Sequence, residues 1–244
     1  SEFTGPNPSS SATICYYLKK RHVFGEMYLE LYDADGAFLK KVPAGTRKGV
    51  NMVRIPTTMD PPRVPKSPNI LGEAIVGPDY PAGKYAVRLV KGTETFTTDL
   101  VINDSPDWKH PEADRKLQRE TLMKAYNLLE ELADVDQKIL DAMDALKQRE
   151  ATARGSALKK TRSLMAACES MREQISATQA GEGGITGQVR LRENIGEVYG
   201  AVAGYQGRPA DLQVKALENY AGQVKDFGKR IDDLIRTDIP ELKK

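Results

Sequence analysis

The side chains that most often carry out catalysis are few in this sequence and far apart. It contains two histidines, His22 and His110, and no G-x-S-x-G stretch that would present a serine nucleophile. A serine or cysteine nucleophile needs a base within hydrogen-bond reach, and neither histidine has an evident partner. Paired carboxylates such as Glu130 and Asp134 have basic neighbours, which favours solvated charge over acid–base chemistry. We therefore predict no catalytic residue and a protein that is not an enzyme.

The sequence also lacks the patterns of a metal or cofactor site. Two cysteines, Cys15 and Cys168, cannot form a tetrahedral zinc site, and we expect both to be small buried apolar residues rather than redox groups. Asp33 and Asp35 could begin a calcium loop, but the later ligands of an EF-hand are absent, so a turn is favoured. The glycine-rich stretch GEGGITG, residues 181–187, has no preceding strand and no phosphate-binding lysine. We predict no cofactor and no metal.

The length and net charge of the chain limit the number of domains and the kinds of partner it can have. A chain of 244 residues is long enough for two domains, each with its own core. The 36 basic residues nearly balance the 34 acidic ones, so net charge predicts neither a nucleic-acid partner nor an anionic membrane. No run of about 20 apolar residues exists, and we expect no membrane insertion. The opening residues SEF resemble a cloning remnant, which predicts a fragment whose export signal would lie outside it.

Residues 12–104 have the pattern of an all-β domain. Short segments rich in β-branched and aromatic residues alternate with glycine or aspartate turns, which is typical of an immunoglobulin-like sandwich. In GPDYPAGKYAVRLVKGTETFTTDLVI, residues 77–102, the alternation predicts a hairpin that turns at Gly92. Residues 1–11 are assigned to a remnant and linker. The other expected strands are 12–18, 26–32, 37–42 and 50–55.

After a linker at 105–110, the apolar residues change to a helical period. The linker contains the only tryptophan, Trp108, which we interpret as a wedge between domains. Apolar residues at three- and four-residue steps from 111 to 244 predict an antiparallel bundle of about four helices. The predicted fold class is therefore α+β with two domains. The expected helices are one of about 35 residues that includes Leu122 to Leu146, then 156–178, 186–205 and 210–236.

One loop of the β-domain is rich in proline, because seven of the 14 prolines fall between Pro56 and Pro81. Prolines restrict the free chain, so a loop this long is expected to be functional or to form contacts. We predict that it docks a partner domain, and a flap that seals an open sheet edge is an equally favoured interpretation. The predicted docking surface consists of Pro61, Pro62, Val64, Ile70, Leu71, Ile75 and Val76.

Several of these segments together resemble a known family. The stretches GPNPSSSATICYYL, LELYDADGAFLKKV, KGVNMVRI and YPAGKYAVRLVKGTETFTTDLVI are similar to the immunoglobulin-like domain of bacterial flagellar hook-capping proteins. They are still more similar to the version that follows a sortilin-like, BNR-repeat β-propeller in secreted bacterial proteins. In the helical part, VYGAVAGYQGRPADLQ at 198–213 resembles the local pattern of that family. Where the family has Trp-Asp at a strand end, this chain has Ile55 and Pro56.

The resemblance implies a carboxy-terminal accessory region of a larger exported protein that is secreted, periplasmic or on the cell surface. Its partner would be the protein's own upstream β-propeller, or another cell-surface protein or glycan. Two alternatives stay open: a carbohydrate- or peptide-binding module, and part of a glycan or peptide hydrolase whose active site lies in the propeller. A binding module would need exposed aromatic residues in a row, for which the candidates are Tyr16, Tyr17, Tyr28 and Tyr32.

Overall fold

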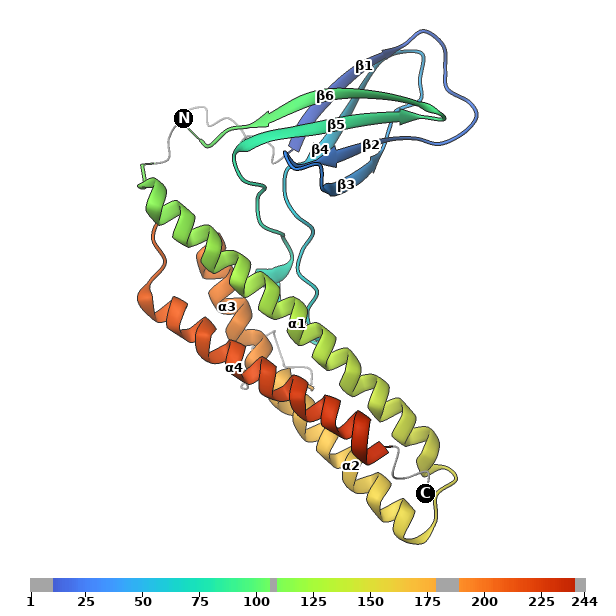
Figure 1. Cartoon of the computed structure of the whole chain (residues 1–244), viewed down its shortest axis with the longest axis vertical. Helices are drawn as coiled ribbons and strands as arrows, with labels where there is room; N and C mark the ends of the chain where they lie inside the picture. Colours follow the sequence, from blue (N-terminus) through green and yellow to red (C-terminus); the bar gives the residue numbers. More distant parts are fainter. Residues whose placement is uncertain (1–10, 106–108, 179–188, 240–244) are drawn as a thin grey trace, which may run out of the picture. The chain divides into compact units, whose positions relative to one another are not determined.

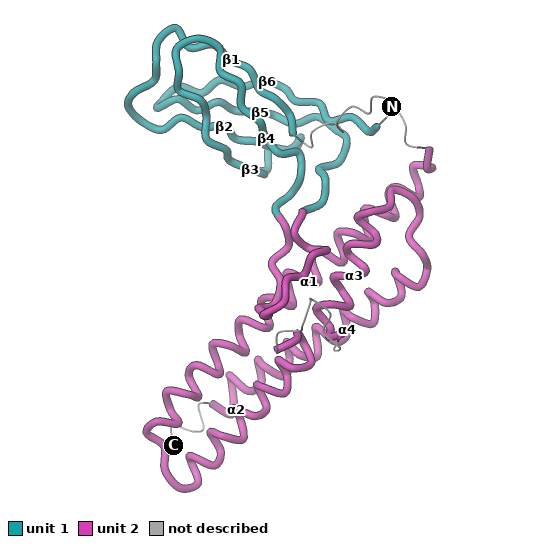
Figure 2. The backbone as a smooth tube through the Cα atoms, turned by 180° about the vertical axis from the view of Figure 1, so that it is seen from behind, with its two compact units in different colours: residues 1–60, 77–108 teal, residues 61–76, 109–244 magenta. Residues whose placement is uncertain are grey.

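The structure is a computed structural model that describes residues 11–105, 109–178 and 189–239. Its contacts divide the chain into two compact units (Figure 2). Unit 1 comprises Ser1–Asp60 and Gly77–Trp108, and unit 2 comprises Pro61–Val76 and Lys109–Lys244. The described residues contain four α-helices and two antiparallel sheets, which confirms the predicted combination of helical and β structure. Trp108, the predicted wedge, and residues 181–187 lie outside the described residues.

Unit 1 is built from two antiparallel sheets (Figure 1). One sheet pairs β1 with β4, and the other has the order β3-β2-β5-β6. The hairpin of β5 and β6 turns at Gly92, where the alternation predicted it and where the backbone has a positive φ of 58°. The strands are β1 (Ser11–Leu18), β2 (Met27–Tyr32), β3 (Phe38–Pro43), β4 (Gly49–Pro56), β5 (Gly83–Lys91) and β6 (Glu94–Ile102).

Both sheets contribute to one apolar core, because alternate residues of their strands point toward it. Leu29 and Leu31 of β2 and Val87 of β5 are buried there. Ile55 of β4 is also buried in this core. The end of β4 is therefore part of the packed core of unit 1.

The turn between β2 and β3 is closed by the side chain of Asp33. Its Oδ1 accepts hydrogen bonds from the backbone N–H groups of Asp35, at 3.0 Å, and Ala37, at 2.8 Å. Gly36 has a φ of 82°, a conformation that residues with a Cβ rarely adopt. The carboxylate that could have begun a calcium loop therefore stabilises a turn.

Unit 2 is organised along one long helix, α1 (Glu112–Glu150). The helices α2 (Gly155–Ile175) and α3 (Leu191–Ala203) follow one another along α1 and run antiparallel to it (Figure 1). The last helix, α4 (Asp211–Asp233), runs parallel to α1. Cross-helix contacts agree with these directions: Arg162–Glu150 at 2.7 Å, Gln118–Val202 at 2.8 Å and Lys138–Asp232 at 2.7 Å.

The number of helices agrees with the prediction, and their arrangement differs from it. At about 1.5 Å per residue, α1 is about 58 Å long, and α2 and α3 together span about 51 Å of that length. The four helices therefore form three columns instead of four. All four contribute to one apolar core, in which the predicted stripe of α4 is buried at Leu217, Val224, Phe227 and Ile231. None of the described helices is long and apolar enough to cross a membrane.

The two cysteines have different surroundings. Cys168 of α2 is fully buried in the helical core, and this burial raises the pKa of its thiol to about 11. Cys15 is exposed on β1, so the expectation that both cysteines are buried is wrong for Cys15. The cause is the strand's alternation, which directs Ile14 and Tyr16 to one face and Cys15 to the other.

Residues 61–76 group with the helices, although the sequence assigned all of 12–104 to the β-domain. We call this segment, Pro61–Val76, the strap. Where it leaves unit 1, the flanking segments pair with each other: Met59 N–H donates to the Pro78 carbonyl at 2.7 Å, and Tyr80 N–H donates to that of Thr57 at 2.8 Å. An extended, proline-rich segment has neither a strand nor a helix period, so local sequence could not reveal its packing partner.

Candidate functional site

The predicted docking loop forms part of the helical core. Leu71 and Ala74 of the strap are buried among helix side chains, and Val64 packs against the same cluster. A short 3₁₀ turn, η1 (Gly72–Ala74), brings Leu71 and Ala74 to the same side of the segment. The strap therefore packs on the helices.

Two glycines on α3 let the strap approach the helix closely. Gly196 and Gly200 are one turn apart and so lie on the same face. A Cβ on Gly196 would be 2.6 Å from Cδ1 of Leu71, and one on Gly200 would be 2.8 Å from Cβ of Glu73. Both distances are shorter than van der Waals contact. The strap thus occupies a groove that exists because these two positions lack side chains.

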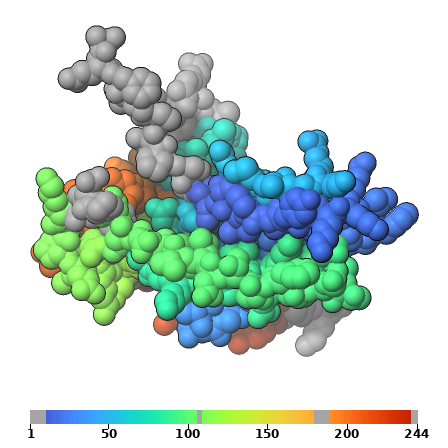
Figure 3. All heavy atoms as spheres, turned by 90° about the horizontal axis from the view of Figure 1, so that it is seen from above, coloured from blue at the N-terminus to red at the C-terminus, as the bar shows by residue number. Residues whose placement is uncertain are grey.

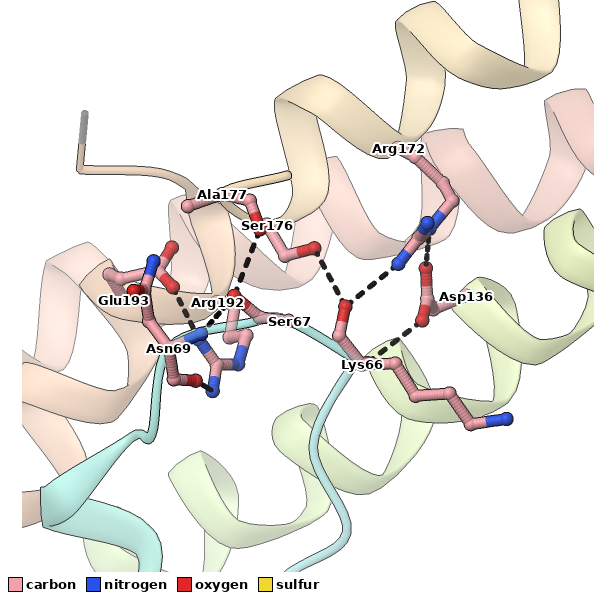
Figure 4. A network of polar contacts seen from close by, with 9 residues as sticks. All are labelled: Lys66, Ser67, Asn69, Asp136, Arg172, Ser176, Ala177, Arg192 and Glu193. Carbon is pink, nitrogen blue, oxygen red and sulfur yellow. Dashed lines mark hydrogen bonds and ion pairs between the residues drawn. The ribbon is translucent and has the colours of Figure 1, made fainter. Parts of the chain in front are cut away.

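A buried carboxylate holds the middle of the strap (Figure 4). Asp136 of α1 is almost completely buried, and its Oδ2 accepts a hydrogen bond from the backbone N–H of Lys66 at 3.0 Å. Its Oδ1 accepts one from Nε of Arg172 on α2 at 2.9 Å. The Arg172 Nη2 then donates to the Lys66 carbonyl at 2.8 Å. The peptide groups on both sides of Lys66 are therefore bound by one ion pair.

A buried arginine holds the strap beside α3 (Figure 4). Arg192 donates from Nη2 to the Asn69 carbonyl at 2.9 Å and from Nη1 to Oε1 of Glu193 at 2.5 Å. Ser67 adds a bond from its Oγ to the Ala177 carbonyl at 2.9 Å. Since a buried charge is costly unless it is paired and hydrogen-bonded, the position of the Asn69 carbonyl matters for the stability of this region.

An exposed ion-pair network holds the first part of the strap. Arg63 donates from Nε to Glu130 at 2.6 Å and from Nη1 to Asp134 at 2.7 Å, and its backbone N–H donates to Glu130 at 2.6 Å. The hydrogen bond from Arg63 lowers the pKa of Asp134, and the two carboxylates raise the pKa of Arg63. The carboxylate pair that we interpreted as solvated charge is therefore the binding site of a distant arginine.

The last residue of the strap is held by a tyrosine of α3. The Tyr199 hydroxyl donates a hydrogen bond to the Val76 carbonyl at 2.7 Å. Tyr199 is almost completely buried, and this burial raises the pKa of its hydroxyl to about 12. The strap is thus fixed near its beginning, in its middle and at its end.

The residues of the predicted docking surface divide into two sets. Leu71 is buried in the helical core and Val64 packs against it, so these two hold the strap on the helices; Pro62 is also buried. Pro61 is exposed. Three large apolar side chains of the strap point away from the helical core: Ile70 is 87% exposed, Ile75 64% and Val76 60%. That these three contact a partner stays a prediction.

Comparisons of the chain with known protein families, with curated proteins and with solved structures find no match. The resemblance to hook-capping and propeller-associated domains therefore rests on the sequence stretches alone.

The four tyrosines proposed for ligand binding do not form an exposed row. Tyr28 and Tyr32 share the outer face of β2, and both are half-buried. Lys41 Nζ lies 3.6 Å from the centre of the Tyr28 ring, and Arg88 covers the Tyr32 ring at 4.2 Å. On the other sheet, only Tyr17 is exposed, while the Tyr16 hydroxyl donates to a backbone carbonyl.

The remaining candidates for chemistry are not gathered into one site. His22 Nε2 lies 3.2 Å from the carbonyl oxygen of its own loop residue Gly25, and His110 contacts the edge of the Tyr205 ring. The described residues contain no group of three or more histidine, cysteine or acidic side chains that could hold a metal. A shallow hollow of about 160 Å³ is lined by Met143, Glu169, Arg172, Glu173 and Thr178.

Sequence reasoning missed the residues that fasten the strap. Asp136 and Arg172 interrupt apolar stripes of α1 and α2, and each is adjacent in sequence to a buried apolar residue. Gly196 and Gly200 interrupt α3 in the same way. A charged or glycine residue at an inward position is the signal that could have indicated a buried polar contact. The identity of the contacting segment could not have been read from that signal.

Proposed function

We propose that the chain is a non-catalytic accessory module of a larger exported protein and that it supports or docks an upstream β-propeller. The chain passes between its two units at three points, because the strap belongs to unit 2 and its flanking segments belong to unit 1. Such interleaving favours a structural role, since neither unit can be removed as one continuous piece.

Support for the immunoglobulin-like character of unit 1 comes from its strand order and one tyrosine. The pairs β1-β4 and β3-β2-β5-β6 match strands B–E and C′–C–F–G of an immunoglobulin sandwich. Tyr85, near the start of β5, donates its hydroxyl to the Pro81 carbonyl at 2.7 Å. A tyrosine at the start of strand F that bonds to the backbone a few residues upstream is a hallmark of that fold.

The proposal rests mainly on one observation: two buried charged side chains of unit 2 form hydrogen bonds with the backbone of the strap. Asp136 and Arg192 are both almost fully buried, and each binds a backbone group of the strap. Two separate buried charges thus hold one extended segment in a defined shape. A segment held in one shape by buried charged groups is what we expect of a module that presents a fixed surface to another domain.

The surface that such a fixed strap presents is apolar. Ile70, Ile75 and Val76 are large and exposed, and the segment that carries them is already ordered by Leu71 and Tyr199. A preordered segment loses little conformational entropy on binding. These three side chains are therefore the proposed contacts for the upstream propeller.

Association between the separately produced upstream region and this chain, measured by calorimetry, tests the proposal. Replacing Ile70, Ile75 and Val76 with Asp should weaken association about tenfold or more, because three apolar contacts are lost. Leu212→Asp, at an exposed apolar position on α4, is the matched control and should have no effect. Unchanged affinity in the triple variant would exclude this docking surface, and a lack of association between the unaltered parts would overturn the proposed function.

Two alternative functions, a ligand-binding module and part of a hydrolase, can be compared with this proposal. A carbohydrate- or peptide-binding module is less well supported, because only one of the four candidate tyrosines is exposed. A hydrolase with its active site in the propeller is tested by assaying the full-length protein with glycans and peptides. Turnover by the full-length protein, abolished by a substitution in the propeller, would favour that alternative.

A further inference from the structure

One end of unit 1 combines exposed apolar side chains with cations that form no ion pair among the described residues. This end carries the loop between β1 and β2, residues 19–26, and the loop between β3 and β4, residues 44–48 (Figure 1). The strand registers place both loops there, because Leu18 pairs with Gly49 and Tyr28 pairs with Pro43. The first of these loops belongs to the blue segment that projects at the surface in Figure 3.

Most of the cations at this end form no ion pair with the part of the chain that the structure describes. The two carboxylates nearby are already paired, Glu26 with Lys41 at 3.6 Å and Glu94 with Lys91 at 2.7 Å. Five further basic side chains on the two loops form no ion pair with the described residues: Lys19, Lys20, Arg21, Arg47 and Lys48.

Two apolar side chains lie at the tip of the same end. Phe24 is 87% exposed and Val23 is 65% exposed, and they are adjacent in the loop between β1 and β2. The outer face of the neighbouring sheet adds Tyr17 and Val50, which are directly opposite one another and both exposed. Exposed apolar side chains that are grouped and surrounded by charge mark interaction sites.

The tip is ordered by contacts within unit 1. The His22 backbone N–H donates to the Thr46 carbonyl at 3.0 Å, which joins the two loops. His22 Nε2 lies 3.2 Å from the Gly25 carbonyl, and Gly25 has a φ of 84°, which turns the chain sharply after Phe24. Phe24 is therefore held at the apex of a turn.

The distribution of charge along unit 1 makes this end different from the rest of the unit. Asp33 and Asp35 lie in the turn between β2 and β3, at the opposite end of β2, and Asp79 forms a β-bridge with Thr58, which follows β4. Unit 1 as a whole carries equal numbers of basic and acidic residues. We predicted no attraction to an anionic membrane from the balanced net charge, which does not show that five basic residues gather on two loops at one end of unit 1.

We propose that this end of unit 1 binds peripherally to the surface of an anionic phospholipid bilayer. The five cations would contact lipid headgroups, and Phe24 and Val23 would enter the boundary between headgroups and acyl chains. Exposed apolar side chains on the same loops as these cations fit an interface that presents anionic headgroups and, beneath them, hydrocarbon. A soluble acidic polymer or an acidic protein surface matches the cations but has no equivalent use for an exposed phenylalanine at an apex.

Sedimentation with vesicles tests the contribution of charge. The chain should bind vesicles of phosphatidylcholine mixed with phosphatidylglycerol and should not bind phosphatidylcholine alone. Replacing Lys19, Lys20 and Lys48 with Gln should weaken binding about 100-fold, since each basic residue near an anionic surface contributes about fivefold. The matched control replaces Lys215, Lys225 and Lys229, three exposed lysines of α4, with Gln and should leave binding unchanged. Equal losses in the two triple variants would overturn the proposal.

The contribution of the apolar tip has its own test. Phe24→Ser should weaken binding to the mixed vesicles on the order of tenfold, because a buried aromatic ring is lost. Leu212→Ser removes another highly exposed apolar side chain, on α4, and should have no effect. All substituted side chains are exposed, so thermal unfolding should not change. If Phe24→Ser binds vesicles as the unaltered chain does, or if polyglutamate binds the chain as tightly as vesicles do, the lipid proposal is wrong.

Discussion

Asp136 and Arg172 form an ion pair of 2.9 Å between two helices, and both of them also bind the peptide groups of Lys66. The pair therefore joins three segments of the chain: α1, α2 and the strap (Figure 4). Asp136 is almost fully buried, whereas the Arg172 side chain keeps some exposure. A pair that also satisfies two backbone groups has most of its hydrogen-bonding capacity filled, which is the condition under which buried charge is tolerated.

Removing the buried carboxylate should destabilise unit 2. In Asp136→Ala, the Lys66 N–H and the Arg172 guanidinium lose their shared acceptor, which should lower the free energy of unfolding by about 3 kcal/mol. Urea unfolding followed by far-ultraviolet circular dichroism measures the change. Asp144→Asn, at an exposed position on the same helix, should alter stability by less than about 0.5 kcal/mol. Equal stabilities of the two variants would show that the strap contact contributes nothing.

The groove on α3 predicts opposite effects for two glycine substitutions. Alanine favours a helix over glycine by about 1 kcal/mol, so Gly222→Ala on α4, where nothing lies near the added Cβ, should stabilise the protein by about that amount. Gly196→Ala gains the same propensity but places its Cβ against Leu71, and overpacking of this kind costs about 1–3 kcal/mol.

Thermal unfolding of the two variants gives the comparison. We expect a higher midpoint for Gly222→Ala and a lower one for Gly196→Ala. A stabilised Gly196→Ala variant would mean that Leu71 can move aside without loss, and the close fit of the strap would then have no energetic role.

The sequence predicted those parts of the fold that depend on local periodicity. The alternation in β5 and β6 and the glycine between them located the hairpin, because both signals act within a few residues. The apolar stripe of α4 located its buried face for the same reason. The three-column arrangement was not predicted, because it depends on the relative lengths of α1, α2 and α3 rather than on their individual patterns.

The candidate site was predicted less well than the fold. The proline-rich loop was identified as a contact-forming segment, but its contacts are made with residues far along the sequence, such as Glu130 and Arg192. Each of these side chains looks like ordinary surface charge in its own helix. These side chains meet the strap only in the folded chain. Polar contacts between residues so far apart in sequence could therefore not be predicted from local sequence patterns.

The hydroxyl of Tyr85 should contribute a measurable share of the stability of unit 1. Tyr85→Phe removes its hydrogen bond to the Pro81 carbonyl and should cost about 1 kcal/mol. Tyr17→Phe changes an exposed tyrosine of the other sheet and should have no effect. Hydrogen exchange of amides in β2 and β5 reports on this unit separately from the helices. Equal protection in both variants would indicate that the bond is not a stabilising one.

Alkaline pH should weaken the attachment of the strap through Tyr199. Its pKa is raised from 10.0 to about 12 by burial, so the folded state holds the phenolic proton more tightly than the unfolded chain does. The stability linked to this proton is fully present below pH 10 and is lost as the pH rises from 10 to about 12. Tyr199→Phe lacks the titrating group, and it should start about 1 kcal/mol less stable because the bond to the Val76 carbonyl is gone.

The stability difference between wild type and Tyr199→Phe should therefore shrink across this pH range. Cys168, with a pKa of about 11, titrates nearby but is present in both proteins, so its contribution cancels in the comparison. Urea unfolding at a series of alkaline pH values provides the measurement. A constant difference between the two proteins across the range would show that the Tyr199 hydroxyl ionises as easily in the folded protein as in the unfolded chain, and that the end of the strap is open to solvent.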